Sequence, residues 1–322
     1  MTASPANESE ARRLEALRLQ MRSIVPYLED PGVIEIALNA DGTVWVERMG
    51  EVMKRTSVRM SKSEALVMLG LVADAVGSEI TAAKPSLAAL IPGWNTRLQA
   101  MIPPIVEAPT FTIRKPPAKV FTLDDYVGRG ILKPREADAI RRAIGERANI
   151  LVGGSTGSGK TTFTNAILHE IAEQTADRLY IVEDLRELQC AAPNKLQIFV
   201  VEPVYGWQRA IVDALRSRPD RIVVGEIRGG AAALELTKAW NTGHPGGVAT
   251  IHANDTRGML DRVCQLLEEV IPTAPRQFLA QVIQLCVHLT KDPAHPGGRR
   301  LTGLDRVLGV DPDGTWRLQR VL

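Results

Sequence analysis

The sequence predicts an α/β protein in which a mostly parallel sheet is preceded by a smaller α+β domain. From about residue 132 onward, short apolar runs alternate with segments of helical periodicity. That order is typical of a parallel sheet covered by helices on both faces. Between one of these apolar runs and the helical segment after it lies a glycine-rich loop. The first 115 residues instead show segments that pair locally, as in hairpins. We therefore expect an α+β N-terminal domain at 1–115, a linker at 116–130 and a second domain at 131–322.

The N-terminal domain begins with an amphipathic segment at residues 10–28, in which Leu14, Leu17, Met21 and Val25 recur every three or four positions. This spacing predicts a helix. Its apolar stripe fits a core, a neighbouring subunit or a membrane surface, and the pattern alone does not choose among them. The further expected elements are strands at Val33–Leu38 and Thr43–Glu47 around an Asp41-Gly42 turn, a helix from the Ser61/Glu64 capping box to Val76, and strands at Asn95–Ile102 and Thr110–Arg114.

The second domain is expected to alternate strands and helices. The expected strands lie at Asn149–Val152, Arg178–Glu183, Leu196–Val201, Arg221–Glu226 and Gly247–Ile251. The expected helices lie at Pro134–Gly145, Thr162–Glu173, Trp207–Arg216, Ala231–Trp240, Thr256–Val270 and Pro275–Val282. A closing β segment contains a turn at Asp311–Gly314. In such a sheet, ligands bind at the carboxyl ends of the strands.

The glycine-rich loop fits the G-x-x-x-x-G-K-[ST] pattern at every fixed position. Its residues are Gly154, Ser155, Thr156, Gly157, Ser158, Gly159, Lys160 and Thr161, and Thr162 follows. Backbone N–H groups and the positive end of a helix surround phosphate groups in this arrangement. Lys160 is expected to neutralise the β- and γ-phosphates, and the Thr161 hydroxyl to bind Mg²⁺. We call Gly154–Thr161 the phosphate loop, and it predicts a nucleoside triphosphate site rather than an ordinary turn.

Three polar residues follow expected strands and are candidates for the same site. Glu183 closes one strand, Glu226 closes another, and His252 lies just beyond a third. Each taken alone fits a solvated strand end. Together, at the edge of a sheet that carries a phosphate loop, they fit catalysis. We expect Glu226 to orient the attacking water, Glu183 to bind the metal or the same water, and His252 to sense the γ-phosphate.

The composition is that of an ordinary globular protein and argues against several other classes. The 322 residues are sufficient for two domains, and 45% hydrophobic and 24% charged residues are ordinary for a globular protein. Lys+Arg 39 against Asp+Glu 37 leaves +2, which argues against direct nucleic-acid binding. Three cysteines without metal-ligand spacing indicate a reducing compartment. The sequence shows neither an 18-residue apolar run nor a secretory signal, so we expect a cytoplasmic protein.

Five motifs in order give a family resemblance. They are the phosphate loop, the acidic segment Ile181–Glu187, Arg216–Arg221, Val224–Gly229 and Thr242–Asn254. This series resembles the secretion (traffic) ATPases of type II and type IV secretion. The run Ala239–His244, with the His252-Ala253-Asn254 ending, looks most like the conjugal-transfer, TrbB-type branch. The absence of a cysteine-rich zinc module also favours the type IV side of the family.

The resemblance implies a RecA-like C-terminal domain, a smaller N-terminal domain, and ATP bound with Mg²⁺ in a ring of six subunits. It also implies that Arg97 and Arg114 reach the γ-phosphate, as an arginine finger does. Without the resemblance, both arginines fit solvated strand edges. The implied function is ATP hydrolysis that powers a conjugative type IV apparatus, with inner-membrane components as partners and peripheral contact with that membrane.

Three rival functions remain open from the sequence. A type II secretion or pilus-retraction motor keeps the same fold. A nucleotide-gated assembly scaffold keeps the site but turns over slowly, because a set of catalytic groups does not report a rate. Direct DNA translocation is disfavoured by the near-neutral charge.

Overall fold

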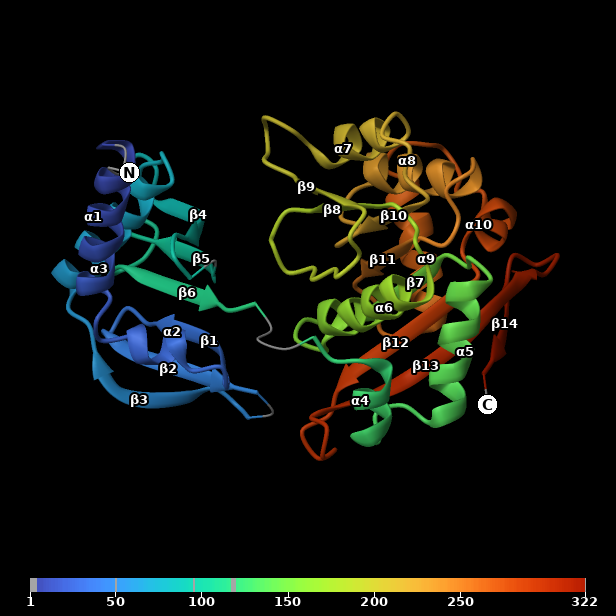
Figure 1. Cartoon of the computed structure of the whole chain (residues 1–322), viewed down its shortest axis with the longest axis horizontal. Helices are drawn as coiled ribbons and strands as arrows, with labels where there is room; N and C mark the ends of the chain where they lie inside the picture. Colours follow the sequence, from blue (N-terminus) through green and yellow to red (C-terminus); the bar gives the residue numbers. More distant parts are fainter. Residues whose placement is uncertain (1–4, 50, 95, 117–119, 322) are drawn as a thin grey trace. The chain divides into compact units, whose positions relative to one another are not determined.

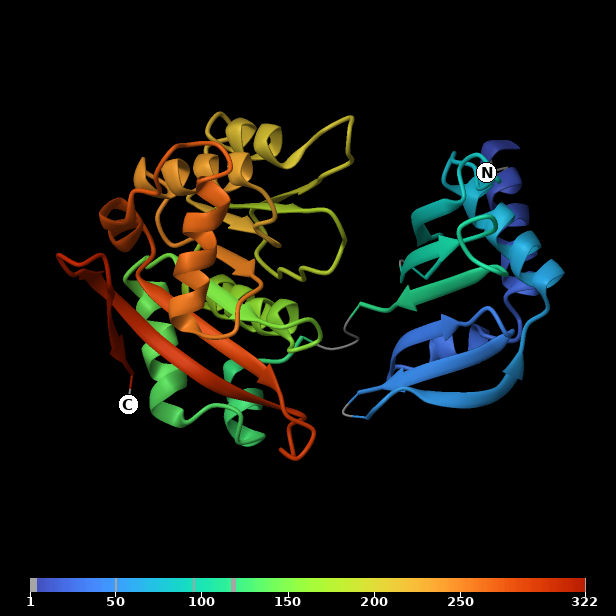
Figure 2. The same ribbon diagram turned by 180° about the vertical axis from the view of Figure 1, so that it is seen from behind.

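The computed structural model describes residues 5–49, 51–94, 96–116 and 120–321. The chain divides into two compact units, Met1–Ala118 and Lys119–Leu322 (Figures 1 and 2). Within the described residues, no helix is both long and apolar enough to cross a membrane.

The first unit, over its described residues, is an antiparallel sheet with helices on one face. The strand order is β3-β2-β1-β6-β5-β4, and each neighbouring pair is antiparallel. The strands are β1 (Val33–Leu38), β2 (Thr43–Arg48), β3 (Lys54–Arg59), β4 (Ser86–Ile91), β5 (Thr96–Met101) and β6 (Thr110–Arg114). The helices are α1 (Pro5–Gln20), α2 (Val25–Glu29) and α3 (Lys62–Ala75), and α1 packs beside α3 (Figure 1). Their apolar residues and the inner face of the sheet form one core.

The single helix expected over residues 10–28 is interrupted in the structure. α1 ends at Gln20 and α2 begins at Val25, with Pro26 in its first turn. Proline lacks the N–H that a helix interior requires, but it fits the first turn of a new helix. Leu17 and Met21 are buried in the core of the first unit, so this segment packs on its own unit.

The second unit is built on a mixed sheet with helices on both faces. Its order, over the described residues, is β14-β13-β12-β7-β11-β10-β8-β9, with parallel pairing from β12 to β9. The strands are β7 (Ile150–Gly154), β8 (Leu179–Glu183), β9 (Lys195–Phe199), β10 (Arg221–Val224), β11 (Val248–Ile251), β12 (Leu285–Lys291), β13 (Arg299–Val310) and β14 (Trp316–Arg320). The last two return antiparallel. The α/β alternation predicted from the sequence is therefore present.

Two hydrophobic cores lie on the two faces of this sheet. One contains residues of α4 (Leu123–Gly128), α5 (Pro134–Gly145) and α6 (Lys160–Gln174). The other contains residues of α7 (Trp207–Ala214), α8 (Gly230–Asn241), α9 (Thr256–Leu267) and α10 (Arg276–Val282). The central strands are buried throughout, as expected for strands covered on both faces.

The segment expected as a linker at 116–130 contains α4 and packs on the second unit. Thr122 caps α4 through a capping box with Asp125. The Tyr126 ring meets the Phe163 ring of α6 edge-on, with the centroids 5.0 Å apart. Sequence periodicity does not predict this contact, because the two residues are far apart in the chain. Of the expected linker, residues 117–119 lie outside the described residues.

A buried ion pair ties the second unit together at the amino edge of its sheet. Arg221, 1% exposed, opens β10, and its Nε donates to Asp177 at 2.7 Å. Its two terminal nitrogens donate to the carbonyls of Gly246, at 3.1 Å, and Ile144, at 3.0 Å. The guanidinium thus joins β10, α5 and the loop before β11.

We expect Arg221→Ala to lower the free energy of unfolding of the second unit by about 3 kcal/mol, because it removes one of the two arginine partners of Asp177 and the buried donors to the Gly246 and Ile144 carbonyls. Urea unfolding followed by tryptophan fluorescence measures this change. Arg209→Ala is the matched control, since Arg209 pairs with Asp213 in an exposed position, and it should cost less than about 1 kcal/mol. Equal losses in the two variants would show that burial of the Arg221 pair is not important.

Candidate functional site

The phosphate loop lies at the carboxyl end of β7, in the parallel part of the sheet. β7 is flanked by β12 and β11, and α6 begins at Lys160 directly after the loop. The loop is closed by a hydrogen bond from Ser158 N to Ser155 O at 3.2 Å. The N–H groups in the first turn of α6 have no carbonyl to reach within the helix. They and the positive helix end make this loop suited to an anion.

Gly154 has no room for a side chain. Its φ is +152°, and a methyl group built there would lie 2.3 Å from the carbonyl oxygen of Leu289 and 2.4 Å from Ser158 Oγ. The loop therefore leaves β7 in close contact with β12. The glycine at this motif position is required by packing as well as by backbone conformation.

The Lys160 side chain folds back over its own loop. It is 8% exposed. Its ammonium lies 2.9 Å from Gly154 O, 3.1 Å from Ser155 O and 3.2 Å from His252 Nδ1. All three of these acceptors are uncharged when His252 is neutral.

A chain of contacts runs from Lys160 along the carboxyl edge of the sheet. His252 Nε2 lies 3.0 Å from Glu226 Oε1. Glu226 Oε2 in turn accepts from Arg228 at 2.7 Å and 2.6 Å, and Arg228 also pairs with Asp184. These residues follow β7, β11, β10 and β8, which is the order of the strands in the sheet. We call this series the edge network.

The position of His252 fixes its favoured protonation state. Nδ1 faces the Lys160 ammonium and so accepts, while Nε2–H donates to Glu226. Burial and the Lys160 charge lower the pKa of His252, and Glu226 acts in the opposite direction. A second proton on Nδ1 would point at the ammonium. The neutral imidazole is therefore the form that bridges the two charged groups.

Glu183 lies outside the edge network and holds a loop. Its carboxylate is 2% exposed. Oε2 accepts from the backbone N–H groups of Glu187 and Leu188 at 3.0 Å and 2.9 Å, and Oε1 accepts from Gln197 at 3.3 Å. Burial raises the pKa of Glu183 to about 7, although the backbone hydrogen bonds favour the ionised form. Both oxygens are thus occupied by the protein itself.

The residue that meets Thr161 is Glu187. Thr161 Oγ1 donates to Glu187 Oε2 at 3.3 Å. The loop that carries Glu187 is also anchored to α6, because Asn165 donates to the Glu187 carbonyl at 3.0 Å and accepts from Gln189 N at 2.9 Å. In the described part of the chain, no group of three or more His, Cys, Asp or Glu residues is arranged to hold a metal.

Arg97 and Arg114 lie in the first unit, where the structure brings them together. They are directly opposite each other on β5 and β6. Their strand neighbours Leu98 and Ile113 point into the core, so both arginines are on the outer face of the sheet. On its other side, Arg114 lies opposite Glu35 of β1, so a carboxylate is also part of this row across the sheet.

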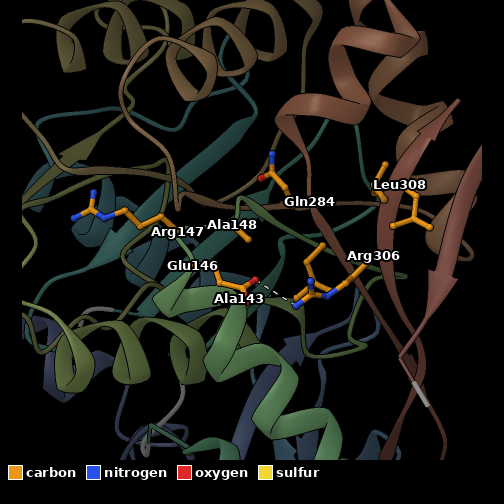
Figure 3. Close-up of a pocket in the computed structure, with 9 residues that line it drawn as sticks. Ala143, Glu146, Arg147, Ala148, Gln284, Arg306 and Leu308 are labelled. Carbon is orange, nitrogen blue, oxygen red and sulfur yellow. Dashed lines mark hydrogen bonds and ion pairs between the residues drawn. The ribbon is translucent and has the colours of Figure 1, made fainter.

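A pocket of about 360 Å³ lies at the other edge of the second-unit sheet (Figure 3). It is lined by Ala143 of α5, by Glu146 directly after that helix, and by Gln284, Arg306 and Leu308. Ala148 and Leu285, which also line it, precede or open parallel strands. The pocket is thus at the amino edge, whereas the phosphate loop is at the carboxyl edge.

The fold and the phosphate loop define an α/β protein of the phosphate-loop class. Residues 18–295 match the family model described as Type II/IV secretion system protein. That match covers most of the chain, and the chain belongs to this family. The family predicted from the five motifs is confirmed.

The chain is also similar to named conjugal transfer proteins. It is 42% identical over 281 residues to the probable conjugal transfer protein TrbB of Sinorhizobium fredii, covering 87% of this chain and 85% of that protein. It is 41% identical over 283 residues to the conjugal transfer protein TrbB of Rhizobium radiobacter, covering 88% and 86%. The X-ray structure of the Legionella pneumophila ATPase DotB aligns with a TM-score of 0.64 and 19% identity, covering 92% and 82%, which shows a shared fold.

Sequence reasoning did not single out two residues of this site. Arg228 lies two positions after Glu226 and binds both Glu226 and Asp184. Its spacing in an extended segment was an available signal, because alternate residues share a side. Glu187 ends the acidic segment Ile181–Glu187, but its contact with Thr161 was not predictable, because it depends on how the loop after β8 folds back.

We expect Glu183→Gln to flatten the dependence of stability on pH. A carboxyl whose pKa rises on folding stabilises the protein fully below its unfolded pKa of 4.5, and this contribution is lost as the pH rises through about 7. The span corresponds to roughly 3 kcal/mol. Glutamine keeps an oxygen acceptor for the loop and does not titrate. Unfolding by urea at several pH values, with Glu146→Gln as an exposed control, measures the effect, and an unaltered profile in Glu183→Gln would contradict it.

Proposed function

We propose that this protein is an ATPase that powers a conjugative type IV secretion apparatus. The observation that carries the proposal is the contact of Lys160 with His252 and of His252 with Glu226. It joins a phosphate-binding lysine to a carboxylate able to orient water. Membership of the secretion family and similarity to conjugal transfer proteins support the same function.

The ligand-free contacts of Lys160 explain how a triphosphate enters the loop. The ammonium is held by two carbonyls and a neutral imidazole. Phosphate oxygens are anionic acceptors and bind an ammonium more strongly than neutral ones. ATP would therefore draw Lys160 toward its β- and γ-phosphates, with the loop N–H groups around them.

The chemistry of Thr161 and Glu187 fits Mg²⁺ bound together with ATP. Their hydroxyl and carboxylate oxygens, 3.3 Å apart, are of the type that Mg²⁺ prefers. Phosphate oxygens and water would complete the ligands, and the bound ion would neutralise phosphate charge. We assign Glu183 the task of ordering the loop that carries Glu187, in place of direct metal binding.

Glu226 and His252 would perform the hydrolytic step. When Lys160 turns to the phosphates, His252 Nδ1 is released, while Nε2–H stays on Glu226. The imidazole can then respond to the γ-phosphate and report its presence to Glu226. Glu226 would orient the attacking water, and Arg97 and Arg114 would supply positive charge to the γ-phosphate when the N-terminal domain closes.

The assembly belongs to the same proposal. It includes a RecA-like second domain, a ring of six subunits and docking on inner-membrane components of the apparatus from the cytoplasmic side, and membership of the secretion family supports it. The pilus-retraction and slow-scaffold alternatives keep the nucleotide site and differ in partner or rate.

Lys160→Ala should abolish ATP binding and turnover, because no other ammonium lies within the loop. Equilibrium binding of ATP and phosphate release by the purified protein measure both. Lys238→Ala, which removes an exposed lysine paired with Glu235, should leave both unchanged. Normal turnover in Lys160→Ala would end the proposed function.

Glu226→Gln should retain ATP binding and lose hydrolysis by roughly 10²-fold or more, since the amide cannot accept a proton from water. Phosphate release under saturating ATP measures the loss, and Glu235→Gln provides the control. If the wild-type protein binds ATP but releases phosphate no faster than Glu226→Gln, the scaffold function replaces the motor.

A further inference from the structure

The strand order of the sheet places Arg299, the first residue of β13, near the phosphate loop. β12 runs parallel to β7 and ends at Lys291, at the same edge as the loop. β13 returns antiparallel, and its first residue, Arg299, pairs with Lys291. Arg299 therefore starts from the edge at which the phosphate loop lies.

The Arg299 side chain lies directly against the phosphate loop. A methyl group built on Gly159 would lie 1.8 Å from Arg299 Nη1 and 2.7 Å from Cζ. Gly159 has a φ of +94° and immediately precedes Lys160. The guanidinium thus occupies the space that any side chain at Gly159 would take.

The turn before Arg299 is held in place. Asp292 N donates to Gly298 O at 3.1 Å, and Gly298 N donates to His295 O at 2.7 Å. Gly297 packs against Ile131, because a methyl group built on Gly297 would lie 2.7 Å from the side chain of Ile131. The backbone that presents Arg299 is therefore fixed by the second unit itself.

The surroundings of Arg299 are positive. Among the described residues, it forms no ion pair with a carboxylate, whereas its neighbour Arg300 pairs with Asp292 at 3.6 Å. The positive end of α6 is adjacent, and Lys160 is the next residue in the chain after Gly159. A half-buried guanidinium in such a place is unfavourable until an anion arrives.

A buried hydroxyl lies in the same corner. Tyr126 is 3% exposed, and within the described chain its hydroxyl has no hydrogen-bond partner of good geometry. Burial raises the pKa of Tyr126 to about 12, and the charges of Arg299 and Arg129 oppose that rise. Tyr126 and Arg299 thus lie next to each other beside the phosphate loop, close enough for a contact with Arg299 to lower the pKa of the Tyr126 hydroxyl.

We propose that Arg299 is a nucleotide-contacting residue whose guanidinium binds the phosphate groups that ATP and ADP share. This inference rests on the proposed function, since it concerns the same nucleotide site. Lys160 approaches the phosphates from inside the loop, and Arg299 approaches from the Gly159 side. A guanidinium suits this task because its planar donors bind phosphate in pairs.

The test compares Arg299→Gln with Arg300→Gln, which removes the same charge one position away. Equilibrium binding is measured with ATP, ADP and inorganic tripolyphosphate. Arg299→Gln should weaken all three by about tenfold or more, the scale of one charged hydrogen bond. Arg299→Lys should recover part of the loss, and Arg300→Gln should match the wild type. If Arg299→Gln bound ATP and ADP more weakly but bound tripolyphosphate as tightly as the wild type, Arg299 would contact the base or the ribose, and the proposed phosphate contact would be wrong.

A second readout separates ligand contact from a structural role. Without nucleotide, Arg299→Gln should melt at or above the wild-type temperature, because a repelled charge is removed, while the increase in Tm caused by ADP should shrink. A lower ligand-free Tm with an unchanged increase would make Arg299 structural and overturn the proposal. If the wild type binds ATP and Arg299→Gln binds equally, the Arg299 inference alone fails. If the wild type binds no nucleotide, both it and the proposed function fail.

Discussion

The neutral imidazole of His252 is the contact on which the site depends. It accepts from an ammonium on one side and donates to a carboxylate on the other, so it joins two charged groups that come from different strands. Protonation would place a second cation beside Lys160, and burial disfavours that form as well. This bridge makes the position of Glu226 depend on the position of Lys160. A ligand that moves the lysine must therefore change the surroundings of the glutamate.

The sheet supports this bridge by holding its strand ends close together. After β10, Thr250 of β11 donates its hydroxyl to the Gly225 carbonyl, and Ile227 N donates to Thr250 O at 2.9 Å. The segment around Glu226 is thus fastened to the strand that precedes His252. Gly225 also allows β8 close approach, since a methyl group there would lie 3.2 Å from Glu183 Cβ. Glycines at this edge thus serve close packing of strand ends as well as the phosphate loop.

Sequence patterns predicted the parts of the fold that depend on residues close together in the chain. The capping box at Ser61, the Asp41-Gly42 hairpin and the strand–loop–helix unit around Lys160 depend on residues near one another in sequence. Other features depend on distant contacts. α4 packs on Phe163, and β4, which the sequence did not reveal, is completed by pairing with β5. Periodicity also joined α1 and α2 into one helix, although Pro26 marked the start of a second.

The sequence by itself determined the α/β class, the family, the phosphate loop and the strand ends that carry Glu226 and His252, because motif spacing and strand periodicity are local properties. Only the tertiary structure decided which carboxylate meets Thr161, that Glu183 turns into its own loop, and that Arg228 and Arg299 join the site. The first two depend on how the loop after β8 folds back, whereas Arg228 and Arg299 reach their partners Asp184 and Gly159 through strand order and an antiparallel return. Both bring together residues that are separated by tens to more than a hundred positions in the chain.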